Sequence, residues 1–183
     1  MVAILLGNGF EEMEALCPCD CLRRVGVEVR LVSVDGSKIV MGAHGIDVAA
    51  DCDLREIEDE PIEMIMLPGG LGGVNAIMAI RDAMALIRQT YDAGQYVAAI
   101  CAAPTVLAAL HITDDKKATC YPGMEDRMGT AQMCMDQSVV QDGRVITSTA
   151  AGTAMEFALH LVQLLRGADA AAELKQSLVY RCR

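Results

Sequence analysis

The feature that most constrains this chain is a series of short, wholly apolar runs, each ending in a turn or an abrupt change of pattern. Three such runs lie at Val2–Leu6, Met64–Leu67 and Tyr96–Ile100. Continuous apolar runs of this length are typical of strands buried on both faces, as in a parallel sheet. Longer segments with helical patterning separate the runs. This alternation predicts an α/β fold with a mainly parallel sheet and helices on both faces.

Turn and helix signals divide the rest of the chain. The first expected helix opens with acidic residues and closes with Arg23 and Arg24 before Gly26, as the helix dipole and a glycine stop favour. Helices are expected over residues 11–24, 74–93 with a break near Ile80, 105–110, 152–166 and 168–178. Further strands are expected over 27–34, 118–119, 139–141 and 145–148, with a small hairpin of 39–41 and 46–48. No linker or repeat interrupts the series, so residues 1–183 are expected to form one domain.

Charge and composition exclude several classes of function. The net charge of -10 disfavours nucleic acid, because the phosphate backbone rewards clustered Lys and Arg. With 3% aromatic residues and no Trp, stacking platforms for bases or sugars are not expected. The longest apolar stretch, residues 96–112, is shorter than the roughly 20 residues that a bilayer requires and contains Pro104, so no membrane is expected. Without a secretory signal the protein is expected to be cytoplasmic, with its eight cysteines as thiols.

The segments that follow the expected strands are the places to look for a site, since ligands bind beyond the carboxyl ends of parallel strands. Three of them, residues 9–14, 68–73 and 99–104, contain residues that could take part in binding or catalysis. In the last, Cys101 stands between Ile100 and Ala102, with Ala103 and Pro104 behind it. Small residues after a strand suit a sharp strand-to-helix turn that holds a nucleophile above the sheet. The pattern therefore points to a reactive Cys101, although a merely buried cysteine fits it equally well.

Taken together, four motifs carry a resemblance over nearly the whole chain. They are Leu67-Pro68-Gly69-Gly70, the segment 98–104 around Cys101, Glu11-Glu12-Met13-Glu14, and the late segment Gly152 to Ala158. In this order they resemble the ThiJ/PfpI superfamily, and most of all its branch of parkinsonism-associated protein deglycases. The resemblance runs from about Val2 to Val179. It implies a flavodoxin-like three-layer sandwich that forms a homodimer and needs no cofactor.

The resemblance also implies roles for single residues. Cys101 corresponds to the oxidisable nucleophile, and Glu14 to a carboxyl group held against its sulfur. A protonated carboxyl group there would donate a hydrogen bond to the thiolate and lower the cysteine pKa, whereas two anions would repel. Backbone N–H groups of Gly70 and Ala102, beside Gly69, are the expected oxyanion donors, because the glycine turn lets a main chain approach closely.

Departures from the family pattern bear on substrate preference. Tyr121 stands where this branch often has His or another aromatic residue, and His44 replaces an arginine that branch members offer from the dimer partner. Both are expected to line the substrate site. Ala102 follows the nucleophile where the proteolytic branch has His, so a general base for peptide hydrolysis is missing. Ala150 and Ala151 replace a Gly-Pro pair of the late loop.

Other candidates carry less weight. Cys17, Cys19 and Cys21 form a C-x-C-x-C run. On a helix, Cys17 and Cys21 share one face and Cys19 points elsewhere, so the three cysteines cannot converge on one ion. No metal is therefore expected. Cys120 is a possible resolving thiol for Cys101, with simple packing as the plainer interpretation. The glycines after Leu67 lack the Lys-Ser or Lys-Thr of a phosphate loop, so no nucleotide is expected.

These observations give one leading hypothesis and two alternatives. The leading one is a cofactor-free, cysteine-dependent glyoxalase or protein deglycase, in which Cys101 adds to an α-oxoaldehyde such as methylglyoxal, or to its early adduct on a thiol or amine, and Glu14 moves the proton. The first alternative is an oxidative-stress sensor or holdase chaperone in which Cys101 is oxidised without turnover. A weaker alternative is an amidase or peptidase, which the missing histidine argues against.

Overall fold

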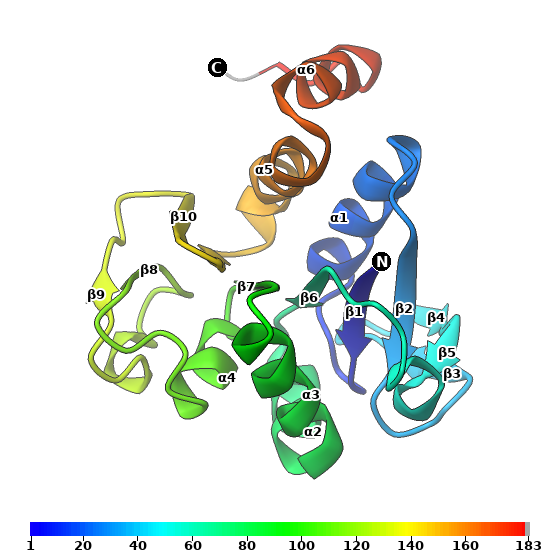
Figure 1. Ribbon diagram of the computed structural model, residues 1–183, viewed down its shortest axis with the longest axis vertical. Coiled ribbons are helices and arrows are strands. Elements are labelled where there is room, and N and C mark those ends of the chain that lie inside the picture. The colour runs from blue at the N-terminus through cyan, green and yellow to red at the C-terminus, as the bar shows by residue number, and fades with distance from the viewer. Residues whose placement is uncertain (182–183) are drawn as a thin grey trace.

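A seven-stranded sheet forms the centre of the computed structural model, which describes residues 1–181 (Figure 1). Its strands run in the order β10, β11, β7, β6, β1, β2, β5, and all neighbours are parallel except the β10–β11 hairpin. The strands are β1 (Val2–Leu6), β2 (Val29–Ser33), β5 (Cys52–Asp53), β6 (Met64–Leu67), β7 (Tyr96–Ile100), β10 (Val139–Asp142) and β11 (Val145–Ser148). The predicted α/β class with a mainly parallel sheet is confirmed.

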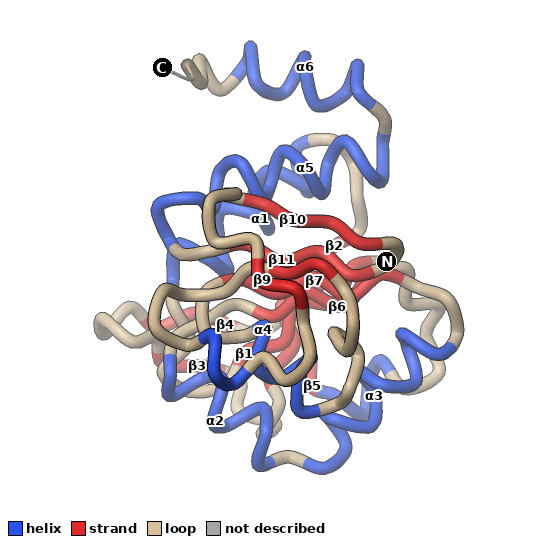
Figure 2. Tube along the Cα trace, turned by 90° about the vertical axis from the view of Figure 1, so that its left-hand side faces the viewer, coloured by secondary structure: helices blue, strands red, loops and turns tan. Residues whose placement is uncertain are grey.

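Helices cover both faces of this sheet. They are α1 (Glu12–Arg24), α2 (Leu71–Ala79), α3 (Arg81–Asp92), α4 (Pro104–Ala109), α5 (Ala154–Arg166) and α6 (Ala168–Ser177). Figure 2 shows the layers from the side: α1 and α5 lie above the strands with α6 outermost, and α2 and α3 lie below. The molecule is therefore the three-layer, flavodoxin-like sandwich that the sequence predicts.

The side chains of the central strands alternate between two apolar cores, as the period of a strand requires. On β1, Val2, Ile4 and Leu6 pack in the core beneath α1 and α5, whereas Ala3 and Leu5 pack in the core above α2 and α3. All five are fully buried. Because helices cover both faces of the sheet here, neither face of β1 contacts solvent, and its sequence is apolar throughout.

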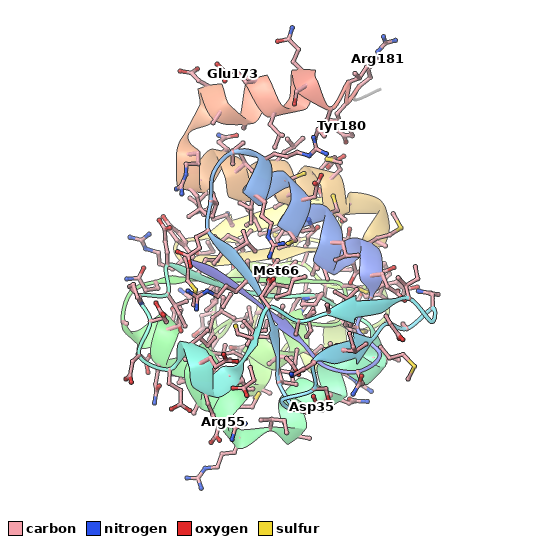
Figure 3. All side chains as sticks on the ribbon, turned by 90° about the vertical axis from the view of Figure 1, so that its right-hand side faces the viewer. Asp35, Arg55, Met66, Glu173, Tyr180 and Arg181 are labelled. Carbon is pink, nitrogen blue, oxygen red and sulfur yellow. The ribbon has the colours of Figure 1, made fainter. Side chains whose placement is uncertain are left out.

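Strand β6 repeats this alternation in the middle of the molecule. Met64 and Met66 face the α1 and α5 side, and Ile65 and Leu67 face the other. Figure 3 shows Met66 at the centre of the structure, whereas the side chain of Arg55 projects at the periphery. The end of β6 therefore has a rigid position, which matters because Gly69 follows it.

Most expected elements are present with shifted ends. The long expected helix is two helices that meet at Ile80, and the late helix begins at Ala154, after a 3-10 turn at Ala151–Thr153, rather than at Gly152. The strand expected over 27–34 is shorter, at Val29–Ser33. The edge strand β5 was not expected, because two residues, Cys52 and Asp53, give no periodic signal.

Two small sheets complete the fold. The hairpin pairs β3 (Ile39–Met41) with β4 (Asp47–Ala49), one residue later than expected, and it contacts the start of α1 through the Phe10–Gly42 bridge. The strand β8 (Lys117–Ala118), expected at 118–119, pairs with β9 (Gln132–Met133). None of the helices within residues 1–181 is long and apolar enough to cross a membrane.

Candidate active site

Cys101 occupies a sharp turn between β7 and α4, as the sequence predicts. Its φ of 66° lies in the left-handed region that a residue other than glycine rarely adopts. The turn is held from both sides: the Cys101 N–H donates to Ser148 O at 2.9 Å, and the Tyr121 N–H donates to Cys101 O at 2.8 Å. Pro104 begins α4 directly behind it. Backbone strain that the surroundings hold in place is typical of functional sites.

Glu14 reaches the same turn from α1. Its side chain is almost fully buried, and its Oε2 accepts a hydrogen bond of 2.8 Å from the N–H of Gly69 at the end of β6. Glu11 caps the helix, because its Oε2 accepts from the N–H of Glu14 at 2.7 Å. The carboxyl group is thus fixed by both its own helix and the neighbouring strand end.

The thiol of Cys101 and the carboxyl group of Glu14 interact directly. Gly69 shows how closely they approach, since a methyl group there would lie 2.5 Å from Glu14 Oε2 and 3.1 Å from Cys101 Sγ. Only a residue without a side chain fits between the two groups. The structure therefore brings together the three residues that the sequence places at the ends of β6, β7 and the start of α1.

Burial governs the ionisation of this pair. Burial raises the pKa of Glu14 to about 7. Burial and then the charge of Glu14 raise the pKa of Cys101 to about 12, although the N–H groups of Ala102 and Gly70 act to lower it. The low thiol pKa expected from the sequence is therefore not found once Glu14 is ionised. Two adjacent buried anions are unfavourable, so the pair carries one negative charge and one proton between pH about 7 and about 12.

The backbone donors expected at the site are in place. The N–H groups of Gly70 and Ala102 both act on the Cys101 sulfur. Gly70 has a φ of 81° and lies against the backbone of Gly9 and Phe10, where a side chain has no room. Two N–H groups from different strand ends therefore favour negative charge on the sulfur.

A cavity of about 500 Å³ opens over Cys101. His44 and Tyr121 line it, together with Glu11, Leu71 and Arg127. His44 belongs to the same chain as Cys101, whereas the arginine that it replaces in the family pattern comes from the dimer partner. Arg127 was not predicted, because the loop that carries it has no periodic pattern linking it to the strand ends. It has no ion-pair partner among residues 1–181, so its guanidinium is available to the cavity.

His44 is held in position by Glu12. Its Nδ1 lies 2.8 Å from Glu12 Oε2, and its backbone N–H donates to Glu12 Oε1 at 2.7 Å. The contact with Glu12 raises the pKa of His44. Burial of Glu12 acts to raise its own pKa, but the hydrogen bonds with His44 and the backbone outweigh burial, and the pKa of Glu12 is lowered. Glu12 is a positioning residue that the sequence did not reveal, since its neighbours Glu11 and Glu14 give the same acidic pattern.

The remaining cysteines lie away from this chemistry. Cys120 is fully buried, and burial raises its pKa to about 11, which fits packing better than a resolving thiol. Cys17 and Cys21 interact with each other, whereas Cys19 is near Arg23 and Asp51, as the helical spacing predicts. Every described cysteine is a free thiol.

Comparison with known proteins places this geometry in a family. Residues 1–164 match the model of the DJ-1/PfpI family. The chain belongs to the DJ-1/PfpI family. It is 36% identical over 177 residues to protein dj-1beta of Drosophila melanogaster, with 96% of this chain and 95% of the relative covered. The crystal structure of the Drosophila protein has a TM-score of 0.95 at 35% identity, and the match covers 99% of this chain and 98% of the other.

Other members of the DJ-1/PfpI family bear on chemistry. The glutathione-independent glyoxalase DJR-1.2 of Caenorhabditis elegans is 32% identical, with 92% of this chain and 89% of the relative covered. The structure titled oxidized DJ-1 of Toxoplasma gondii has a TM-score of 0.94 at 30% identity, covering 99% of this chain and 98% of that one. The family resemblance predicted from the sequence is confirmed.

Proposed function

We propose that this member of the DJ-1/PfpI family is a cofactor-free glyoxalase that converts α-oxoaldehydes such as methylglyoxal, or their early adducts on thiols and amines, into hydroxy acids. One observation carries the proposal: the buried carboxyl group of Glu14 lies beside the thiol of Cys101, which lines a cavity of about 500 Å³. Such a pair supplies both a nucleophile and a group that moves protons near neutral pH. The activity named for the Caenorhabditis relative agrees with this chemistry.

The first step is addition of Cys101 Sγ to the aldehyde carbon. The new C–S bond forms while the carbonyl oxygen gains negative charge, and the N–H groups of Gly70 and Ala102 stabilise that oxygen. The shared proton then passes from Glu14 to the oxygen, which gives a neutral hemithioacetal and leaves Glu14 ionised. No metal is needed, because the electrophile is already an aldehyde.

Glu14 then moves a proton between two carbon atoms. Its carboxylate removes the hydrogen of the former aldehyde carbon to give an enediolate and returns the proton to the adjacent carbon, while the hydroxyl proton of the hemithioacetal passes to the former ketone oxygen. The product is a thioester of a 2-hydroxy acid on Cys101. Water hydrolyses this thioester, which releases lactate from methylglyoxal and restores the thiol, so the net reaction adds one water molecule. A pKa of about 7 suits Glu14 both to accept and to donate the proton.

Turnover of methylglyoxal by Cys101→Ser tests the proposal. A serine hydroxyl is a far weaker nucleophile than the thiol, so lactate formation should fall to background while circular dichroism shows a folded protein. Cys134→Ser is the control, since Cys134 is a partly buried cysteine outside the cavity lining. Full turnover by folded Cys101→Ser would exclude the mechanism.

A redox role is the second candidate function. Cys101 is partly exposed in the cavity, and backbone N–H groups act on its sulfur, which suits a sulfinate as well as an oxyanion. The related Toxoplasma structure is titled as oxidized. Mass spectrometry after mild peroxide treatment separates the two roles: two added oxygen atoms on Cys101 without measurable aldehyde turnover favours a sensor or holdase. An amidase is less well supported, because Ala102 follows the nucleophile and His44 Nδ1 is engaged by Glu12.

A homodimer is part of the proposal. Met13 on α1 and the hairpin residues Ile39, Met41 and Ile46 are each more than half exposed, although they are large and apolar. The hairpin contacts the start of α1 through the Gly9 N–H, which donates to Met41 O at 2.7 Å. A second copy of this chain would cover these side chains. Ile46→Lys should give a monomer by light scattering, whereas a dimeric Ile46→Lys would place the interface elsewhere.

A further inference from the structure

Helices α1 and α5 carry three sulfur-bearing residues that the proposed aldehyde chemistry does not use: Cys17, Cys21 and Met155. Cys17 and Cys21 lie one helical turn apart on the same face of α1, so their side chains are neighbours. Met155, in the first turn of α5, has its Sδ 3.9 Å from Cys21 Sγ. Figure 1 shows α1 and α5 side by side on one face of the sheet, so the cluster joins two helices that are far apart in sequence.

The surroundings of the cluster distinguish it from ordinary packing. Cys21 is buried, whereas Cys17 and Met155 are partly exposed. A metal ion binds a cysteine as the thiolate, so an ion bound here would replace the protons of Cys17 and Cys21.

The separation of the Cys21 and Met155 sulfur atoms fits a three-coordinate ion. Three sulfur atoms that surround one ion in a plane, each about 2.3 Å from it, lie about 4.0 Å from one another. The observed 3.9 Å between Cys21 and Met155 agrees with this separation. The third donor is a methionine from another helix, so the argument that Cys19 cannot join Cys17 and Cys21 does not apply.

The donor types select the ion. Two thiols and a thioether are soft ligands, which favour Cu(I) over Zn²⁺ or the hard cations. Asp20, between Cys19 and Cys21 in the sequence, is paired with Arg24 at 2.7 Å through Oδ2. We propose that Cys17, Cys21 and Met155 form a Cu(I) site that is separate from Cys101. Binding of Cu(I) by both thiolates releases their two protons to solvent and involves no change of oxidation state.

A competitive titration tests the site. The reduced protein in a Cys101→Ser background, which removes the cavity thiol, is titrated anaerobically with Cu(I) against a chromophoric Cu(I) chelator. Cys17→Ser should lose one equivalent of tightly bound Cu(I). Met155→Leu keeps the volume and apolar character of the side chain but removes the thioether, and should weaken binding about tenfold or more. X-ray absorption should show three sulfur neighbours at about 2.3 Å.

Cys19→Ser is the matched control, because it lies in the same C-x-C-x-C run but faces Arg23 and Asp51. It should bind Cu(I) as tightly as the background protein. If Cys17→Ser does not fold, Met155→Leu decides alone. Unchanged affinity in folded Met155→Leu, or equal losses in Cys17→Ser and Cys19→Ser, would overturn the proposal. Since no variant in this set alters the proposed catalytic residues beyond the common background, failure here would leave the glyoxalase proposal untouched.

Discussion

Gly69 offers the sharpest test of how the candidate site is built. A methyl group there would lie 2.5 Å from Glu14 Oε2, 2.7 Å from Cys101 Cβ and 3.1 Å from Cys101 Sγ. Ordinary contacts of a methyl carbon begin at 3.4 Å, so the carboxyl group has to move by up to about an ångström. The N–H of Gly69 also holds Glu14 Oε2 at 2.8 Å, and this hydrogen bond would be distorted as well.

Gly69→Ala should therefore cost both stability and turnover. Overpacking of this kind typically costs about 1–3 kcal/mol in the free energy of unfolding. A misplacement of about 1 Å between reacting groups costs roughly a hundredfold in rate. Urea unfolding and kcat/KM for methylglyoxal measure the two effects separately. The rate loss should exceed what the folded fraction explains, because the pair is disturbed in molecules that remain folded.

Gly152→Ala is the matched control for this experiment. Gly152 is exposed, and a methyl group there would meet nothing within 4 Å, although it neighbours Ala151, whose backbone is hydrogen-bonded to Glu14. The control should keep wild-type stability and kcat/KM. If Gly69→Ala matches Gly152→Ala in both measurements, Glu14 and Cys101 are not as close as the structure places them, and the reasoning about the pair fails.

Three further predictions concern proton transfer, substrate positioning and the core. Burial raises the pKa of Glu14, and its ionised form removes the substrate proton, so kcat should rise with pH and level off above about 7 rather than above 4.5. Glu14→Gln should abolish this rise. A flat pH profile of kcat in the unchanged protein would speak against Glu14 as the base. His44→Ala should raise KM with little change in kcat, since His44 lines the cavity without contacting the pair; a fall in kcat alone would contradict this role. Phe157→Ala should lower the free energy of unfolding by about 3–5 kcal/mol in urea titrations, because the ring is fully buried between α5 and the sheet; a loss below 1 kcal/mol would show that the core is poorly packed there.

The fold could be predicted largely because burial leaves a direct mark on sequence. The strands β1, β6 and β7 are covered on both faces, so their apolar runs coincide with their ends in the structure. Elements held by a few backbone contacts leave no such mark. Cys52 and Asp53 join the sheet only by pairing with Val32 and Ser33, and their own residue types do not predict a strand.

The site could be predicted where residues follow strands directly. Cys101 and Gly69 meet because β6 and β7 are neighbours in the sheet, which the alternation of elements makes expected. Arg127 reaches the cavity from a long loop, and the pairing of Glu12 with His44 depends on how the β3–β4 hairpin docks on α1. Ionisation was the least predictable property, since the balance between burial and backbone donors at Cys101 depends on distances that sequence does not contain.

The most direct measurement of the central claim counts the negative charges on the Glu14–Cys101 pair. Thiolate absorbance is recorded against Cys101→Ser, and the infrared band of the protonated carboxyl group against Glu14→Gln, at a pH of ~9.5, midway between the two pKa values. The structure predicts that the thiolate fraction and the carboxylate fraction add up to one. Full ionisation of both groups at this pH would contradict the account.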